Sequence, residues 1–500
     1  MPGPLALPFI GAALPLLTSK RPSDVLVAWT AKHGPCVRVG MPGGKRVVLV
    51  TSPALIAEAS SLPPAAPCPS AALTGGSGGP LPKAAHAALA ASLGSAEAAS
   101  ACGSFGATLE SAQRLVAALV GAGPNAAVDV ADGLDRLALD AAVKGAFGLE
   151  AGGLAADAGG RNVAKEGFGA CPLLRDLRAG VAGLGPLAGL GCPASGAAAA
   201  AAPLQGHWKV MAAALAARGP PGADDKSVGA ALVRAAAAGG LGEGADLAAT
   251  LAAVVVASTL PTSRAAAWAL YDLCAEPAVQ DKVARELGEA ALLAHGEDRA
   301  PRLMTEADVA GRLPYLGAVV RESLRVHAVG APGPGLAGAV RRAGPAGAAL
   351  GGVHLPPGTL VAAPPAAVHA APANYAAPAR FSPDRWLEPV KAHTPKAVTE
   401  QPGPVLLVGK PKAHGGAPGA FVPFGSGGAS ACPAEGAALL HVTALVATLV
   451  SNFRMRLDDA MGGRKGVSAA CVEDAAGARL GAGLKMVFVP RASIGFSADV

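Results

Sequence analysis

The chain has 500 residues and is rich in small ones: 51% of the residues are hydrophobic, many of them alanine, and only 3% are aromatic. It contains 67 glycines and 44 prolines among its 500 residues. Both shares exceed the average usage of about 7% for glycine and about 5% for proline. The net charge is +6, and the charges are spread along the chain instead of forming the basic patches typical of nucleic-acid binding. The composition therefore indicates a globular, mildly basic protein and gives no indication of a nucleic-acid partner.

The N-terminal stretch, MPGPLALPFIGAALPLL, is apolar but interrupted by prolines. It is too short to cross a bilayer and has no basic segment before it, so we expect neither a membrane anchor nor a secretion signal. The eight cysteines are scattered without paired spacing, which favours reduced thiols. The sequence leaves open a cytoplasmic protein or one that lies peripherally on an endoplasmic-reticulum or plastid membrane.

Short elements are predicted in the first half of the chain. Alternating valines around a Pro-Gly-Gly turn predict a β-hairpin over Val37 to Ser52, and a short helix follows from Pro53 to Ser60. The glycine-rich run from Gly75 leads into a helix that carries Lys83 and His86. Residues 150 to 240 are expected to form helices joined by loops.

The longest apolar segment runs from Asp246 to Leu273. Its length would suit a transmembrane helix, but Pro261, two adjacent hydroxyl residues and Arg264 favour a buried central helix. Downstream, we expect an amphipathic helix over residues 276–291 and a capping box at residues 305–308. We also expect a strand pair over residues 353–363 and a surface loop over residues 387–420.

Two stretches in the C-terminal half contain candidate functional residues. Glu322 and Arg325 are three residues apart and share one helix face, where a buried carboxylate would need positive partners. The turn FVPFGSGGASACPAE, residues 421–435, places Cys432 directly before an apolar helix, where backbone N–H groups favour a thiolate. Such a thiolate suits a metal ligand or a nucleophile, and the alternative is a buried structural cysteine.

The order of these motifs resembles that of the cytochrome P450 family, the haem-thiolate monooxygenases. ExxR at Glu322 to Arg325 is followed by FSPDRW at Phe381 to Trp386 and then by the FGSG turn and Cys432. The resemblance runs from about Pro4 to the C-terminus. It implies a mainly α fold with small β-sheets, in which haem lies between the central helix and the cysteine loop. Residues 1–20 would be a proline-rich hinge without an anchor, and residues 21–500 one catalytic domain.

The resemblance also implies roles for individual residues. Cys432 would be the axial ligand of haem b, and Glu322, Arg325 and Arg385 would form a structural ion network. The other residues expected beside the haem are Phe424, Gly425 and Gly427 in the turn, with Lys83 and His86 at a propionate. For Lys83 and His86, a solvated surface face is the alternative.

The resemblance assigns the distal side of the haem to Thr262 and Ser263, with Pro261 in the position of the usual acid. This proline is similar to that of a branch containing sterol and bile-acid hydroxylases and prostacyclin synthase. The cysteine loop departs from the family pattern by one extra glycine, by Ser430 in place of a cationic propionate partner, and by Ala434 in place of glycine.

We therefore expect a monomeric monooxygenase that hydroxylates or demethylates an apolar small molecule, such as a sterol or other lipid. It would use O2 and electrons from an NADPH-dependent reductase or another donor. The alternatives are a haem-thiolate isomerase or dehydratase of lipid peroxides, and a non-catalytic member with weakened haem binding.

Overall fold

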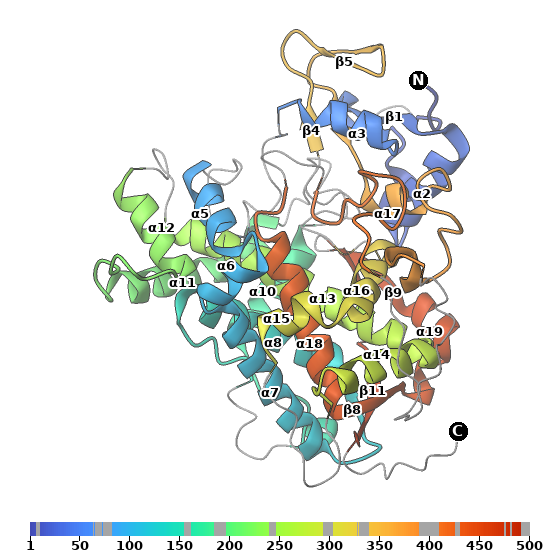
Figure 1. Ribbon diagram of the computed structural model, residues 1–500. Coiled ribbons are helices and arrows are strands. Elements are labelled where there is room, and N and C mark those ends of the chain that lie inside the picture. The colour runs from blue at the N-terminus through green and yellow to red at the C-terminus, as the bar shows by residue number, and fades with distance from the viewer. Residues whose placement is uncertain are drawn as a thin grey trace.

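The structure is a computed structural model that describes residues 1–6, 11–63, 65, 73, 83–154, 162–184, 197–239, 247–293, 304–327, 329, 340–389, 410–425, 431–474, 477–480 and 483–491. Helices form most of these residues, as the sequence predicts, and small sheets lie at the periphery (Figure 1).

The helices fall into two groups along the chain. Those of the first half are α1 (Leu14–Thr18), α2 (Pro22–His33), α3 (Pro53–Ser60), α5 (Lys83–Leu93), α6 (Ala96–Ala101), α7 (Ser104–Ala122), α8 (Val130–Phe147), α9 (Val163–Glu166), α10 (Pro172–Gly183), α11 (Ala197–Ala216) and α12 (Val228–Ala237). Those of the second half are α13 (Leu247–Ala275), α14 (Pro277–Glu289), α15 (Glu306–Gly311), α16 (Pro314–His327), α17 (Pro365–Ala370), α18 (Glu435–Asn452) and α19 (Gly463–Ala470).

Four small sheets contain the strands. The first has the order β1 (Cys36–Gly40), β2 (Arg46–Val50), β7 (Leu360–Ala362), β4 (Val340–Arg342). The second has the order β3 (Ala127–Asp129), β11 (Lys485–Pro490), β8 (Phe453–Leu457). The remaining two are hairpins, β5 (Ala348–Leu350) with β6 (Val353–Leu355) and β9 (Cys471–Asp474) with β10 (Gly477–Leu480).

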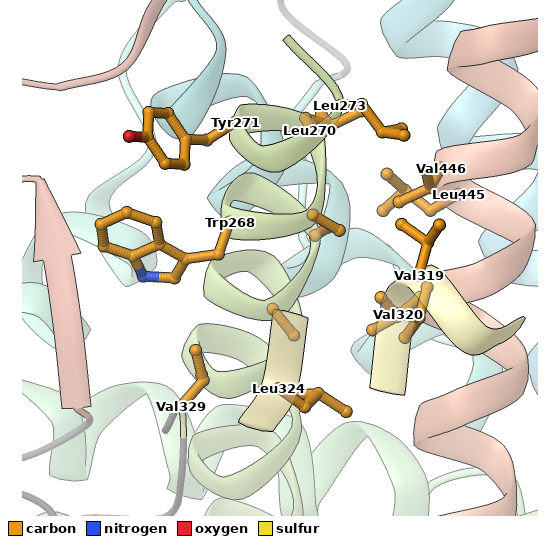
Figure 2. Packing of buried hydrophobic residues seen from close by; sticks show 14 of the residues in the cluster. Trp268, Leu270, Tyr271, Leu273, Val319, Val320, Leu324, Val329, Leu445 and Val446 are labelled. Atoms are coloured by element: carbon orange, nitrogen blue, oxygen red, sulfur yellow. The ribbon is translucent and has the colours of Figure 1, made fainter. Parts of the chain in front are cut away.

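The longest helix, α13, runs through the middle of the molecule and packs against α8, α16 and α18. Figure 2 shows the apolar contact at its C-terminal half, where Leu270 and Leu273 face Val319 of α16 and Leu445 of α18. These four side chains have no solvent-exposed surface. Burying a side chain of this size contributes about 1.5–3 kcal/mol relative to leaving it exposed, so this three-helix contact fixes the elements around the cysteine loop.

Within the described part of the chain, two helices, α13 and α18, are long and apolar enough to cross a membrane by length and composition. Most of each lies inside the protein. This burial agrees with the predicted central helix over residues 246–273.

Several short-range predictions are confirmed. The hairpin forms with Val39 opposite Val47, and α3 has the predicted bounds. At the start of α15, Thr305 and Asp308 make the reciprocal hydrogen bonds of a capping box.

The predicted strand pair over residues 353–363 is wrong in its pairing. Both strands exist, but β6 pairs with β5, while β7 pairs with β2 and β4. Gly351 and Gly352 adopt positive φ angles of 56° and 74°, which allow the tight β5–β6 turn. Pro356 and Pro357 have no N–H to donate to a ladder across the expected turn.

A buried ion network holds α16 to the segment that precedes the cysteine loop. Both oxygens of Glu322 accept from Arg325, at 2.9 Å each, and Oε1 also accepts from Arg385 Nε at 3.0 Å. The Trp386 indole and the Ser382 backbone N–H donate at 2.9 Å each. Burial would raise the pKa of Glu322, but the hydrogen bonds and charge of Arg325 hold it below its ordinary value, so the carboxylate stays ionised.

Glu322→Ala should yield little folded protein, because it leaves two buried guanidinium groups without their anion, at a cost of about 3–5 kcal/mol. The matched control is Asp281→Ala, since Asp281 faces Arg454 at 4.0 Å in an exposed pair. Loss of an exposed pair costs about 0–1 kcal/mol. Soluble yield and thermal unfolding of both variants measure the difference, and equal stability of the two would contradict the structural role of Glu322.

Candidate functional site

The cysteine loop closes on itself immediately before α18. The Cys432 backbone N–H donates to the Phe424 carbonyl at 2.8 Å, so the turn brings the predicted aromatic residue next to the cysteine. Gly425 has a φ of 91°, a conformation that other residues rarely adopt. The predicted Gly427 and the substituted Ser430 lie outside the described residues.

Among the residues that the structure describes, no positively charged side chain lowers the pKa of the Cys432 thiol. Burial raises this pKa, the nearby Glu435 carboxylate raises it further, and a hydrogen bond from the Ala434 backbone N–H partly offsets the rise. The helix start therefore does not by itself give the low pKa that the sequence suggests. A thiolate at this position needs the positive charge of a bound metal, which deprotonates a coordinating thiol.

A buried histidine joins the cysteine loop to the ion network. His369 Nε2 accepts from the Val422 backbone N–H at 3.1 Å, and its Nδ1 donates to the Arg325 carbonyl at 3.1 Å. Burial lowers the pKa of His369 to about 3, so the ring is neutral and keeps this one tautomer. The ring also stacks on Phe421, with centroids 5.8 Å apart. The loop is thus positioned by the same network that fixes α16.

One face of α13 borders open space although the helix is otherwise buried. The residues of this face are small or half-polar and recur at helical spacing: Ala253, Ala257, Ser258, Pro261 and Thr262 are partly or fully exposed. Ser258 and Thr262 share the lining of a cavity of about 50 Å³ with His441 and Leu445 of α18. Ser258 and Thr262, at one edge of this face, therefore lie beside α18, the helix that begins just after Cys432.

The two hydroxyl residues predicted on the distal side point in different directions. Thr262 lies on the exposed face, and no described residue offers its hydroxyl a hydrogen-bond partner. Ser263 is buried, and its hydroxyl lies within hydrogen-bond distance of two acceptors, the Asp135 carboxylate of α8 and the Leu260 carbonyl. It lines a second cavity of about 670 Å³ between α8, α10 and α13. Ser263 and Thr262 therefore line different cavities.

The two residues predicted to bind a haem propionate, Lys83 and His86, also lie in different surroundings. His86 Nε2 lies 3.3 Å from the Ala431 carbonyl, next to Cys432, and donates to it since a carbonyl can only accept. Lys83, one turn earlier on α5, is exposed. The structure places His86 against the cysteine loop and Lys83 in solvent.

Sequence reasoning missed the buried His369 and the partly buried His441. Neither stands in a motif with a second polar residue at helical spacing. Their partners, Val422 and Ser104, are 53 and 337 residues away in the chain. Only the fold reveals these contacts.

The fold and site define a mostly helical protein in which a glycine-rich turn places Cys432 just before α18, one of the helices that pack against the central helix α13. The structure has a TM-score of 0.71 with the haem domain of cytochrome P450DA, over 98% of both chains at 18% identity. A family model described as Cytochrome P450 matches residues 240–465. The chain therefore has the fold of a cytochrome P450 haem domain, and its C-terminal half is similar in sequence to the cytochrome P450 family.

Curated relatives match shorter stretches. The chain is 37% identical over 134 residues to cytochrome P450 monooxygenase sphH of Aspergillus fumigatus, covering 27% of this chain and 23% of the relative. It is 35% identical over 133 residues to cytochrome P450 81F4 of Arabidopsis thaliana, covering 27% of this chain and 24% of the relative. The matched stretches thus span about a quarter of these relatives.

The residues present fit the haem b and cysteine ligand that the family implies. A single thiol with an N–H hydrogen bond suits a metal that a macrocycle already holds. The exposed face of α13 consists of small side chains, which leave room for a flat group. Gly436 allows α18 to approach the end of α5 closely, because a Cβ there would lie 2.5 Å from the Gly94 carbonyl oxygen.

Cys432→Ser should remove the thiolate-type absorption band of the reduced, carbon-monoxide-treated protein, because no sulfur would remain to bind iron. Cys102 is the matched control: it is buried and donates to the Ala99 carbonyl, so Cys102→Ser should keep the band. A difference spectrum of each variant measures this. Retention of the band in Cys432→Ser, with its loss in another cysteine variant, would move the ligand elsewhere.

Proposed function

We propose that this protein is a haem-thiolate monooxygenase that oxidises an apolar small molecule with O2 and electrons from a reductase. The observation that carries the proposal is the position of Cys432 just before α18, the helix that lies beside Ser258 and Thr262 at the edge of the exposed face of α13. Bound haem would supply the activation of O2, favoured by electron donation from its thiolate ligand.

The protein's own residues would bind and position the reactants. Cys432 would hold the iron, and His369 would keep the loop in place through Val422. The small residues Ala253 and Ala257 would leave room above the haem, and the buried apolar side chains of α13 would exclude bulk water. Thr262 would hold a water molecule at the exposed face of α13, since its hydroxyl needs a partner.

Pro261 shapes this position without interrupting the helix. Although a proline is expected to kink a helix, α13 is continuous from Leu247 to Ala275. Pro261 has no N–H, so the Ala257 carbonyl cannot accept the usual helical hydrogen bond from it. An acceptor is therefore left on the exposed face.

We infer the substrate class from the exposed face of α13. Ala253 is partly exposed and Ala257 is exposed, and neither carries a polar side-chain atom. Such surroundings favour an apolar substrate. The narrower class of sterols or other lipids rests on the resemblance of Pro261 to the branch of sterol and bile-acid hydroxylases.

Pro261 also favours a second candidate, an isomerase or dehydratase of lipid peroxides. Such an enzyme needs neither a reductase nor an acid beside Thr262. Product formation from an apolar substrate, with and without NADPH and a reductase, distinguishes the two. Turnover only with the electron donor supports the monooxygenase, whereas turnover of a hydroperoxide without it supports the isomerase. Failure to bind carbon monoxide after reduction would contradict both.

Thr262→Ala should raise the fraction of reducing equivalents released as hydrogen peroxide, because the water that Thr262 holds would be lost. Proton transfer by a positioned group contributes about 10²–10⁴-fold, so product formation with NADPH should fall. A reaction driven by added peroxide should be largely spared, which makes it the internal control. If the variant couples NADPH to product as well as the parent does, Thr262 has no such role.

A further inference from the structure

The cavity of about 50 Å³ behind Thr262 has several polar groups on its wall. It lies among α7, α8, α13 and α18, and alanine and leucine form much of its lining. The polar residues on its wall are Ser104, Thr108, Ser258, Thr262 and His441. Their hydrogen bonds decide what can occupy it.

Three of the four hydroxyl groups already donate to protein carbonyls. Ser104 donates to Ala99 at 2.8 Å, Thr108 to Ser104 at 3.0 Å and Ser258 to Val254 at 2.7 Å. Thr262 is the exception among the residues that the structure describes, because its hydroxyl does not bond back to the preceding turn. Its proton therefore remains available to a molecule in the cavity.

His441 has one ring nitrogen left for the cavity. Its Nε2 lies 3.2 Å from the Ser104 hydroxyl, and when Ser104 donates its single proton to the Ala99 carbonyl at 2.8 Å, His441 Nε2 is the donor to Ser104. Nδ1 then carries a lone pair and has no partner among the described residues. Burial lowers the pKa of His441 to about 4, so the ring is neutral at neutral pH.

The volume is sufficient for water, because a single molecule needs roughly 10–15 Å³ measured in this way and two to four polar partners. We propose that ordered water fills this cavity and links His441 Nδ1 to the Thr262 hydroxyl. His441 would be a positioning residue for Thr262, a role that rests on the proposed function of Thr262.

The donors and acceptors around such a water balance. The water accepts the Thr262 proton and donates its own two protons to His441 Nδ1 and to the Ser258 oxygen, whose proton already goes to Val254. This arrangement fixes the direction of the Thr262 O–H bond. The lone pairs of the Thr262 oxygen are then free to accept a proton donor at the exposed face of α13.

Two substitutions separate the two nitrogens of the ring. An asparagine at position 441 can place its amide oxygen where Nδ1 lies, whereas a glutamine amide reaches the position of Nε2. His441→Asn should therefore keep the water, and His441→Gln should lose it while keeping the contact with Ser104. Thr448→Val is the matched control on the same helix, because the Thr448 hydroxyl donates only to Ala444.

Two readouts do not depend on turnover. Crystal structures of the parent and the variants should show water in the cavity of the parent, His441→Asn and Thr448→Val. Nitrogen-15 NMR of selectively labelled histidine should show His441 as the neutral tautomer with its proton on Nε2. An empty cavity in the parent, or the opposite tautomer, would overturn the proposal even if every variant failed to fold and whether or not the proposed activity is found.

The third readout tests positioning. The fraction of electrons released as peroxide should rise in His441→Gln toward that of Thr262→Ala, and stay at the parental value in His441→Asn and Thr448→Val. Equal peroxide release by the asparagine and glutamine variants, or a rise in the control, would show that His441 has only a packing role and would overturn the proposal.

Discussion

The haem-binding half depends on the hydrogen bonds that the Glu322 carboxylate accepts. The carboxylate accepts five hydrogen bonds from Arg325, Arg385, Trp386 and the Ser382 backbone, and it has no exposed surface. Charged groups are costly to bury unless every one has its partner, so this carboxylate accepts only one arrangement of α16 and the segment after residue 381. His369 extends that constraint to Val422 and hence to the cysteine loop.

Local patterns predicted much of this fold. The hairpin, α3, the capping box at Thr305 and the buried central helix follow from turn residues, caps and apolar length, which act within a few residues of one another. The ordered motifs predicted a cytochrome P450-like fold and the pairing of Glu322 with Arg325 and Arg385, and the structure confirms both. Partners that are distant in the chain were harder to predict: β7 pairs with β2 instead of β6, and Ser263 turns toward Asp135 instead of joining Thr262.

The site shows the same limit. The sequence identifies Cys432, but the pKa of its thiol depends on burial, which no local pattern gives, and the structure raises that pKa instead of lowering it. The contact of His441 with Ser104 could not be predicted either, because the two residues meet only when the chain folds. Local chemistry thus predicts a candidate ligand, and packing decides what surrounds it.

The pairing of β7 with β2 has a consequence for how the chain folds during synthesis. Val47 pairs in parallel with Leu360, so β2 cannot form this pairing until a strand roughly 300 residues later has been synthesised. At translation rates of about 5–20 residues per second, that interval lasts about 15–60 s. Throughout it, the apolar edge of β2 has no permanent neighbour and can pair with other chains. The nascent N-terminal hairpin is therefore where a chaperone would be needed most.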